Sequence, residues 1–353
     1  MKSMPLVPPV VLLLLTFAQA IAASAQIPRF LNTVSYPAPG AYMAVLADVN
    51  GDGCLDIVTA NGYGYSGAGV SLLLGTKNGG FKPAQTLVPD GNPTWAVVGD
   101  FNNDGKLDIA VANEPDPNLP PPVGGPAQNA VSLLLGNGDG TFQASIDTST
   151  AGARFMAAAD FNADGKLDLA ITGTSSMDQI LLGNGDGTFN VIDTSVDGAS
   201  EAIITGDFNK DGKPDLLTGG WQMLGNGDGT FAFGQALPVS GLQAVADLNG
   251  DGIPDLIGSY LTFHAYIAEV AFGSADGTWA PSFISNYSSD GNVVAGSFDG
   301  DSREDLFGAG APPNGGIDPP RGGLFLGNGD GYFTLGATGF GFSLNGGIGG
   351  YPA

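Results

Sequence analysis

Residues 160–170 read DFNADGKLDLA and residues 180–189 read ILLGNGDGTF, and these two stretches decide the fold because both recur along the chain. The first contains the pattern D-x-N-x-D-G-x-x-D, which occurs intact five times, beginning at Asp48, Asp100, Asp160, Asp207 and Asp247. A sixth, altered copy begins at Ser297. Successive copies begin 52, 60, 47, 40 and 50 residues apart, and each is followed by a relative of the second stretch, such as LFLGNGDGYF. Self-similarity at this spacing is the signature of a repeat architecture, with six units over about residues 42–342.

Within each unit the residue pattern predicts four strands and no helix. An apolar run such as WAVVGDF leads into the Asp pattern, a run such as LDIVTA ends it, and SLLLG and the segment after the second stretch supply two more strands. The Asn, Asp and Gly residues of N-G-D-G-T tolerate the positive φ of a hairpin turn. The residue just before each Asp pattern is Ala or Gly, which predicts an inner strand crowded by neighbouring backbone. Such units predict an all-β chain, a β-propeller of four-stranded antiparallel blades.

The composition excludes several classes of protein. The chain has 353 residues, and 11 Lys+Arg against 35 Asp+Glu give a net charge of −24. A surface this acidic cannot neutralise phosphates, which argues against a nucleic-acid partner and against adhesion to anionic lipid. The single cysteine, Cys54, excludes an intrachain disulfide, and the single histidine, His264, leaves little for a zinc site or for His-based catalysis.

The N-terminus is predicted to be a signal peptide covering residues 1–25. Lys2 is followed by an apolar stretch that is densest from Val10 to Phe17, and Ala-Ser-Ala at residues 23–25 precedes the expected cleavage site. The alternative is an uncleaved membrane anchor, but the apolar core is short for a span. We therefore expect an exported protein, secreted, at the cell surface or periplasmic, with a propeller domain over residues 26–353 and no transmembrane anchor after cleavage.

The Asp pattern predicts calcium loops. Positions 1, 3, 5 and 9 bring hard oxygen ligands to one point, Gly at position 6 allows a sharp turn, and a backbone carbonyl at position 7 would complete the shell. The loop is not an EF-hand, because that loop needs Glu at position 12. The alternative is a set of Asx-turns without metal, but three carboxylates packed in each of five loops would repel one another without a cation. About five Ca²⁺ sites are expected, with a weaker sixth. The predicted ligands are Asp48, Asn50, Asp52, Asp56, Asp100, Asn102, Asp104, Asp108, Asp160, Asn162, Asp164, Asp168, Asp207, Asn209, Asp211, Asp215, Asp247, Asn249, Asp251, Asp255, Asp299, Asp301 and Asp305.

The loops DFNNDGKLDIA and DFNADGKLDLA, with LLLGNGDGTF downstream, resemble the FG-GAP/VCBS repeat of secreted bacterial proteins and the calcium-binding blades of the integrin α-subunit propeller. The resemblance covers about 300 residues. It implies a propeller with Ca²⁺ in the loop between the first two strands of each blade. It does not imply one biochemical activity, because members adhere, bind glycans or accompany catalytic modules. The family usually closes with seven blades, whereas six units are counted here, so the ring is expected to have six or seven blades.

A ligand is expected on the face opposite the calcium loops. The loops of that face are irregular, and irregular loops on a rigid scaffold are the usual place for recognition. Aromatic residues gather there: Tyr42, Tyr63, Tyr65, Trp95, Phe155 and Trp221. Near the start of the first strands, beside the expected channel mouth, lie the candidate ligand-binding residues Tyr42, Trp95, Arg154 and Glu201. The alternative role for these rings is packing of blade against blade, and we give it more weight than ligand binding.

These observations favour an exported calcium-binding propeller that acts as a binding or adhesion module for extracellular glycan or protein ligands. The leading alternative is a polysaccharide-active enzyme, a lyase or hydrolase, on the same scaffold. Such enzymes need a paired acid and base at a mouth, and the sequence offers no such pair away from the calcium loops. A structural fragment of a larger surface protein is a third interpretation. No catalytic residue is therefore predicted.

Overall fold

The computed structural model describes residues 41–62, 69–89, 92–114, 130–173, 178–193, 202–261, 266–280, 283–289, 292–298, 301, 303–310, 321–329 and 333–341. The predicted signal peptide, His264 and Glu201 lie outside these residues. Every regular element in the described ranges is a β-strand, in agreement with the all-β prediction. No helix in this part of the chain is long and apolar enough to cross a membrane.

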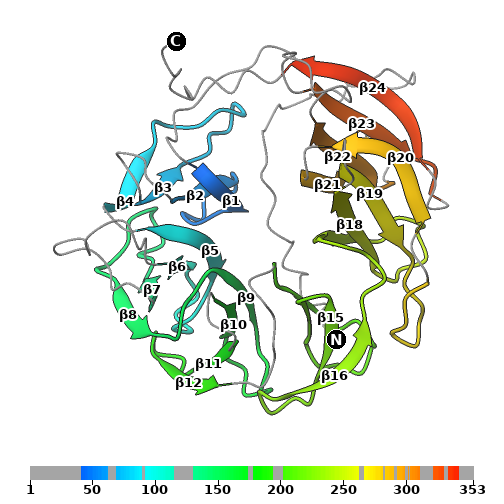
Figure 1. The fold of residues 1–353 in the computed structure, drawn as a ribbon. Coiled ribbons are helices and arrows are strands. Elements are labelled where there is room, and N and C mark those ends of the chain that lie inside the picture. Colours follow the sequence, from blue (N-terminus) through cyan, green and yellow to red (C-terminus); the bar gives the residue numbers. More distant parts are fainter. Residues whose placement is uncertain are drawn as a thin grey trace, which may run out of the picture. The chain divides into compact units, whose positions relative to one another are not determined.

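The strands form six four-stranded antiparallel sheets, which we number 1 to 6 in chain order. The described chain divides into two compact units, residues 41–236 with sheets 1–4 and residues 237–341 with sheets 5 and 6 (Figure 1). In the first unit, sheets 1 and 2 contain β1 (Ala41–Ala47), β2 (Asp56–Asn61), β3 (Gly69–Leu73), β4 (Gln85–Pro89), β5 (Pro93–Gly99), β6 (Asp108–Asn113), β7 (Ala130–Leu134) and β8 (Ile146–Ser149). Sheets 3 and 4 contain β9 (Phe155–Ala159), β10 (Asp168–Thr172), β11 (Gln179–Gly183), β12 (Phe189–Asp193), β13 (Ile204–Gly206), β14 (Asp215–Thr218), β15 (Trp221–Gly225) and β16 (Phe231–Ala236).

The second unit repeats the same meander twice. Its strands are β17 (Leu242–Ala246), β18 (Asp255–Leu261), β19 (Tyr266–Ala271), β20 (Phe283–Ser289), β21 (Asn292–Gly296), β22 (Asp305–Gly310), β23 (Arg321–Gly327) and β24 (Phe333–Gly341). Within each sheet of both units, every strand pairs with the next one along the chain, so each repeat unit folds as one propeller blade. The closed ring of six or seven blades stays a prediction.

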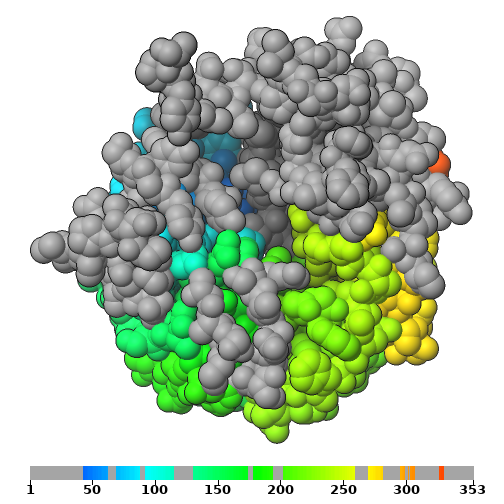
Figure 2. Space-filling view, in the orientation of Figure 1, coloured from blue at the N-terminus to red at the C-terminus, as the bar shows by residue number. Residues whose placement is uncertain are grey.

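Burial within a sheet explains the two kinds of strand sequence. All residues of the second strands β6 and β10 are buried, because both faces of these sheets are covered, and they read as continuous apolar runs. The fourth strand β12 is almost wholly exposed beyond its first residue, and it is mixed in character. The described residues of the first unit form the surface that runs from blue through green in Figure 2.

Successive sheets of the first unit pack through their first strands, because β1 lies beside β5, β5 beside β9 and β9 beside β13. The residue before the Asp pattern is crowded at Gly99, but by side chains and not by the predicted neighbouring backbone. A Cβ atom there would lie 2.5 Å from Leu167 Cδ1 of sheet 3, so a larger residue would require the Leu167 side chain to move. The described buried residues form three hydrophobic clusters. One joins sheets 1–3, a second joins sheets 3 and 4, and a third lies in the second unit.

Candidate metal centre and neighbouring surfaces

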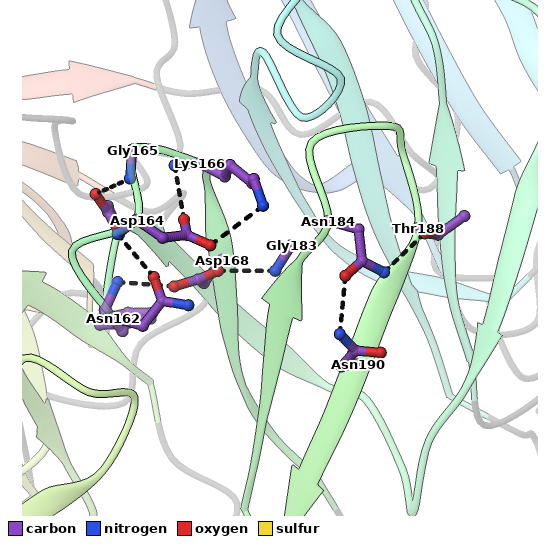
Figure 3. Close-up of polar contacts among 11 residues, drawn as sticks. Asn162, Asp164, Gly165, Lys166, Asp168, Gly183, Asn184, Thr188 and Asn190 are labelled. Atoms are coloured by element: carbon purple, nitrogen blue, oxygen red, sulfur yellow. Dashed lines mark hydrogen bonds and ion pairs between the residues drawn. The ribbon is translucent and has the colours of Figure 1, made fainter.

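The loop between the first two strands of sheet 3 folds around its own acceptor groups (Figure 3). Asp160 Oδ1 and Asn162 Oδ1 both accept the backbone N–H of Asp164, at 3.0 Å each. Asp160 Oδ2 accepts the N–H of Gly165 at 2.9 Å, and Asp164 Oδ1 accepts the N–H of Lys166 at 3.0 Å. Gly165 has a φ of 83°, the left-handed conformation that glycine adopts freely, so the turn needs Gly at position 6.

The same four hydrogen bonds recur in every intact loop, so the five loops share one conformation. Their lengths in the other four loops lie between 2.8 and 3.1 Å. In the altered sixth loop Asp301 Oδ1 accepts the N–H of Arg303 at 2.9 Å, while Asp299 lies outside the described residues.

The Asp at position 9 has a role that the sequence analysis missed. Asp168 is fully buried, and its Oδ2 accepts the N–H of Phe161 at 2.8 Å while its Oδ1 accepts the N–H of Gly183 at 2.7 Å. It thereby ties the loop to the start of the N-G-D-G-T turn. A Cβ atom at Gly183 would lie 2.2 Å from the Leu167 carbonyl oxygen, so only glycine fits there. Position 9 makes the same pair of bonds in all six sheets, at 2.7–3.1 Å. The recurrence of this Asp with a downstream L-G-N-G was the signal that could have revealed it.

Burial and hydrogen bonding shift the pKa values of the loop acids in opposite directions. Burial raises the pKa of Asp168, Asp215 and Asp255 to about 6, against the opposing effect of the two backbone N–H groups that each carboxylate accepts. At exposed position 5 the backbone N–H of Lys106 holds the pKa of Asp104 below its ordinary value. Asp104 is therefore ionised at neutral pH, whereas the three buried position-9 acids have pKa values only about one unit below it.

The donor set of the loops fits a hard cation. Because Asp160 Oδ1 and Asn162 Oδ1 both contact the N–H of Asp164, two ligand oxygens already converge on one point. Carboxylate, amide and carbonyl oxygens are the ligands that Ca²⁺ takes. Among the described residues, however, no three His, Cys, Asp or Glu side chains are grouped closely enough to hold a metal as they stand. A cation would have to take the place of backbone N–H groups and of the Lys166 ammonium, which lies 3.3 Å from Asp164 Oδ2.

The N-G-D-G-T turn is confirmed as a hairpin turn with its own hydrogen bonds. In sheet 3 the Thr188 N–H and hydroxyl both donate to Asp186 Oδ1, at 3.0 and 2.6 Å, and Asn184 Nδ2 donates to Thr188 Oγ1 at 2.9 Å. Gly185 and Gly187 have φ values of 74° and 85°, as the sequence predicts. The Asn190 side chain donates to Asn184 Oδ1 at 2.8 Å and closes the group (Figure 3).

In the first unit the turns of sheets 3 and 4 also contact the Asp loop of the preceding sheet. A Cβ atom at Gly185 of sheet 3 would lie 3.2 Å from Asn103 Nδ2 in the loop of sheet 2. The Phe at position 2 of that loop, Phe101, packs edge-to-face on Phe189, with ring centroids 5.9 Å apart. In the next pair of sheets the Gly229 N–H donates to the Phe161 carbonyl oxygen at 3.0 Å. The two sequence signatures therefore form one contact that runs from sheet to sheet.

Of the four candidate ligand residues, the structure describes the side chains of Trp95 and Arg154, and both make contacts between sheets. Trp95 is only 9% exposed, its Nε1 donates to the Met156 carbonyl oxygen at 2.8 Å, and its ring packs edge-to-face on Phe155 at 4.9 Å. Arg154 Nε lies 3.7 Å from Glu114 Oε2, and the guanidinium sits 5.4 Å from the centre of the Phe155 ring. These contacts join sheets 2 and 3. The Tyr42 side chain and Glu201 lie outside the described part of the structure, so the predicted ligand set stays a prediction.

Two known repeat families match this sequence. The FG-GAP-like repeat family matches residues 48–111, 123–171 and 160–218, and the FG-GAP repeat family matches residues 92–134. No curated protein matches the chain.

Two solved structures share the fold. A "putative 6-phosphogluconolactonase" from Bacteroides uniformis is 16% identical, with a TM-score of 0.57 and coverage of 86% of each chain. A protein from Lactobacillus plantarum is 10% identical, with a TM-score of 0.50 and coverage of 84% of this chain and 83% of that one. At these identities the likeness shows the fold alone.

Proposed function

Because the chain is an FG-GAP repeat protein, we propose that it is an exported, calcium-binding β-propeller that acts as a binding module for glycan or protein ligands outside the cell. The observation that supports calcium binding most directly is the shared conformation of the five intact loops. Each loop holds the same amide and carboxylate oxygens in the same hydrogen-bonded arrangement.

In sheet 3 the proposed ligands are Asp160, Asn162 and Asp164, with the carbonyl oxygen of Lys166. The structure supports a shared role for Asp168, because each of its oxygens accepts one buried N–H and keeps a second lone pair. Bound calcium would offset two of the three negative charges that the loop carries within nine residues. It would thereby stiffen a loop that supports the turn of the next sheet.

Calcium binding is tested by titrating chelator-treated protein with CaCl₂ in a calorimeter. We expect about five sites, with dissociation constants of about 10⁻⁴ to 10⁻³ M, as in other extracellular modules. An Asp160→Asn, Asp164→Asn double variant should lose one of them. Mg²⁺ should replace Ca²⁺ poorly because it keeps its waters and demands a smaller octahedral shell. A protein that takes up no calcium at millimolar concentration would show that the loops are metal-free turns.

The binding role rests on the family, whose repeats are typical of extracellular proteins, and on the predicted signal peptide. It is tested by probing glycan and protein arrays with the secreted chain in calcium and in EDTA. Saturable binding to a ligand supports a binding module, whereas turnover of a polysaccharide during the same incubation would support the enzymatic alternative.

A further inference from the structure

Exposed apolar side chains gather on one part of the first unit. Among the described side chains, five large hydrophobic ones are exposed, and four of them lie on the last strand of sheet 3 and the last two strands of sheet 4, namely Val191, Ile192, Trp221 and Phe233. Trp221 is 42% exposed and Phe233 57% exposed. These strands, β12, β15 and β16, are labelled in Figure 1.

Strand register places two of these side chains on facing surfaces of sheets 3 and 4. Ile192 pairs with Ile180, and Phe233 pairs with Met223; Ile180 and Met223 belong to the core cluster between sheets 3 and 4. Because paired residues share one face of a sheet, Ile192 faces sheet 4 and Phe233 faces sheet 3. The rings of Trp221 and Phe233 meet at 6.0 Å and 88°. A register shift in β16 beside this pair marks a bulge, a device that re-aims side chains. We name the contacting rings of Trp221 and Phe233 the aromatic patch.

Unmet hydrogen-bonding capacity lies beside the same patch. Thr218 is the cross-strand partner of Trp221, so the two side chains share one face of sheet 4. Thr218 is 2% exposed, and its Oγ1 has no hydrogen-bond partner. A buried polar atom without a partner is costly, so its presence calls for an explanation such as a missing ligand.

From these observations we infer that the aromatic patch is a binding site for a neutral sugar ring, which deepens the proposed binding function and rests on it. Trp221 and Phe233 together expose roughly 200 Å², far less than the roughly 800 Å² that a stable protein partner covers on each side. The patch and the neighbouring Asn190 and Thr218 carry no ionisable group, although the chain as a whole has a charge of −24. A pyranose ring matches this surface, because its apolar C–H face can stack on the two aromatic rings and its hydroxyl groups can hydrogen-bond Thr218 Oγ1.

The experiment measures binding of neutral oligosaccharides (cellohexaose, maltohexaose and mannohexaose) and of anionic polygalacturonate to the full chain in calcium, by calorimetry. We expect at least one neutral probe to bind and polygalacturonate to bind less well. Trp221→Ala should weaken the binding by about tenfold or more, as loss of an aromatic anchor does. Val191→Ala is the matched control, because Val191 is an exposed apolar residue on β12 that pairs with Leu181 and faces away from sheet 4.

Thr218→Val provides a second arm that does not depend on an aromatic ring. Valine keeps the shape of threonine, and the hydroxyl has no protein partner to lose, so the variant should fold at least as stably as the parent. Sugar binding should nevertheless weaken if Thr218 serves the ligand. Binding that Trp221→Ala leaves unchanged would overturn the site while the glycan-binding function stands. If none of the neutral probes binds, the inference is wrong, and the array experiment with protein ligands separately decides the proposed function.

Discussion

Replacing Asp168 with alanine should destabilise the metal-free protein far more than replacing Asp164, although both belong to the same loop. Asp168→Ala leaves the N–H groups of Phe161 and Gly183 buried without an acceptor. Each such group costs about 1–3 kcal/mol, so the free energy of unfolding should fall by about 2–6 kcal/mol. Asp164 is about one-third exposed and accepts one exposed N–H, so its loss should cost less than about 1 kcal/mol.

The pH of the measurement matters because Asp168 is costly to ionise. Its pKa of about 6 means that at pH 7 the buried charge itself costs about 3 kcal/mol relative to the unfolded chain. Alanine removes that cost together with the hydrogen bonds. The full loss is therefore expected at pH 5, where the carboxyl is mostly protonated and still accepts hydrogen bonds. A smaller loss is expected at pH 7.

The assay is urea denaturation in EDTA at pH 5 and pH 7, followed by tryptophan fluorescence. Trp95 is buried against Phe155 of sheet 3, so it reports on this part of the first unit. Equal destabilisation by Asp168→Ala and Asp164→Ala at pH 5 would refute the reasoning, because it would mean that the two buried N–H groups find other acceptors.

Three further results are expected. In about tenfold excess of calcium over its dissociation constant, each site adds about 1.4 kcal/mol, so five sites should add about 7 kcal/mol, and EDTA should lower the melting temperature sharply; identical melting curves would contradict calcium binding. Folding raises the pKa of Asp168, Asp215 and Asp255 above their unfolded values, so the stability that these groups contribute is complete below pH 4 and is lost as the pH rises through about 6. The free energy of unfolding in EDTA should therefore fall between pH 5 and pH 7, and a rise over that window would count against the burial of these groups. Gly187→Ala should destabilise more than Gly220→Ala, although both glycines have positive φ (85° and 76°), because a Cβ atom at Gly187 would lie 3.3 Å from Leu135 Cδ2 of the preceding sheet, whereas one at Gly220 would meet no atom within 4 Å. Equal losses in urea denaturation would show that the turn does not pack on the preceding sheet.

The local structure of each unit could be predicted from the sequence because its interactions close within a few residues. The Asp loops bond to backbone groups two to five positions away, and the N-G-D-G-T turns to groups two to four positions away. Because the Asp pattern occurs intact five times, the sequence also predicts that these five loops share one conformation. The repeated Ala or Gly before each Asp pattern indicated a close approach, but that the Leu167 side chain makes it at Gly99 depended on how sheets 2 and 3 pack.

The roles of single side chains depended on contacts that no local pattern contains. Asp168 reaches Gly183, which is 15 residues away, and Trp95 reaches Met156, which is 61 residues away. Trp95 and Trp221 are both aromatic residues in or beside strands, yet one is sealed by a neighbouring sheet and the other is exposed. Which of them can meet a ligand depends on strand register and on how adjacent sheets pack. Those are properties of surfaces brought together by folding, and residue types and their spacing along the chain do not specify them.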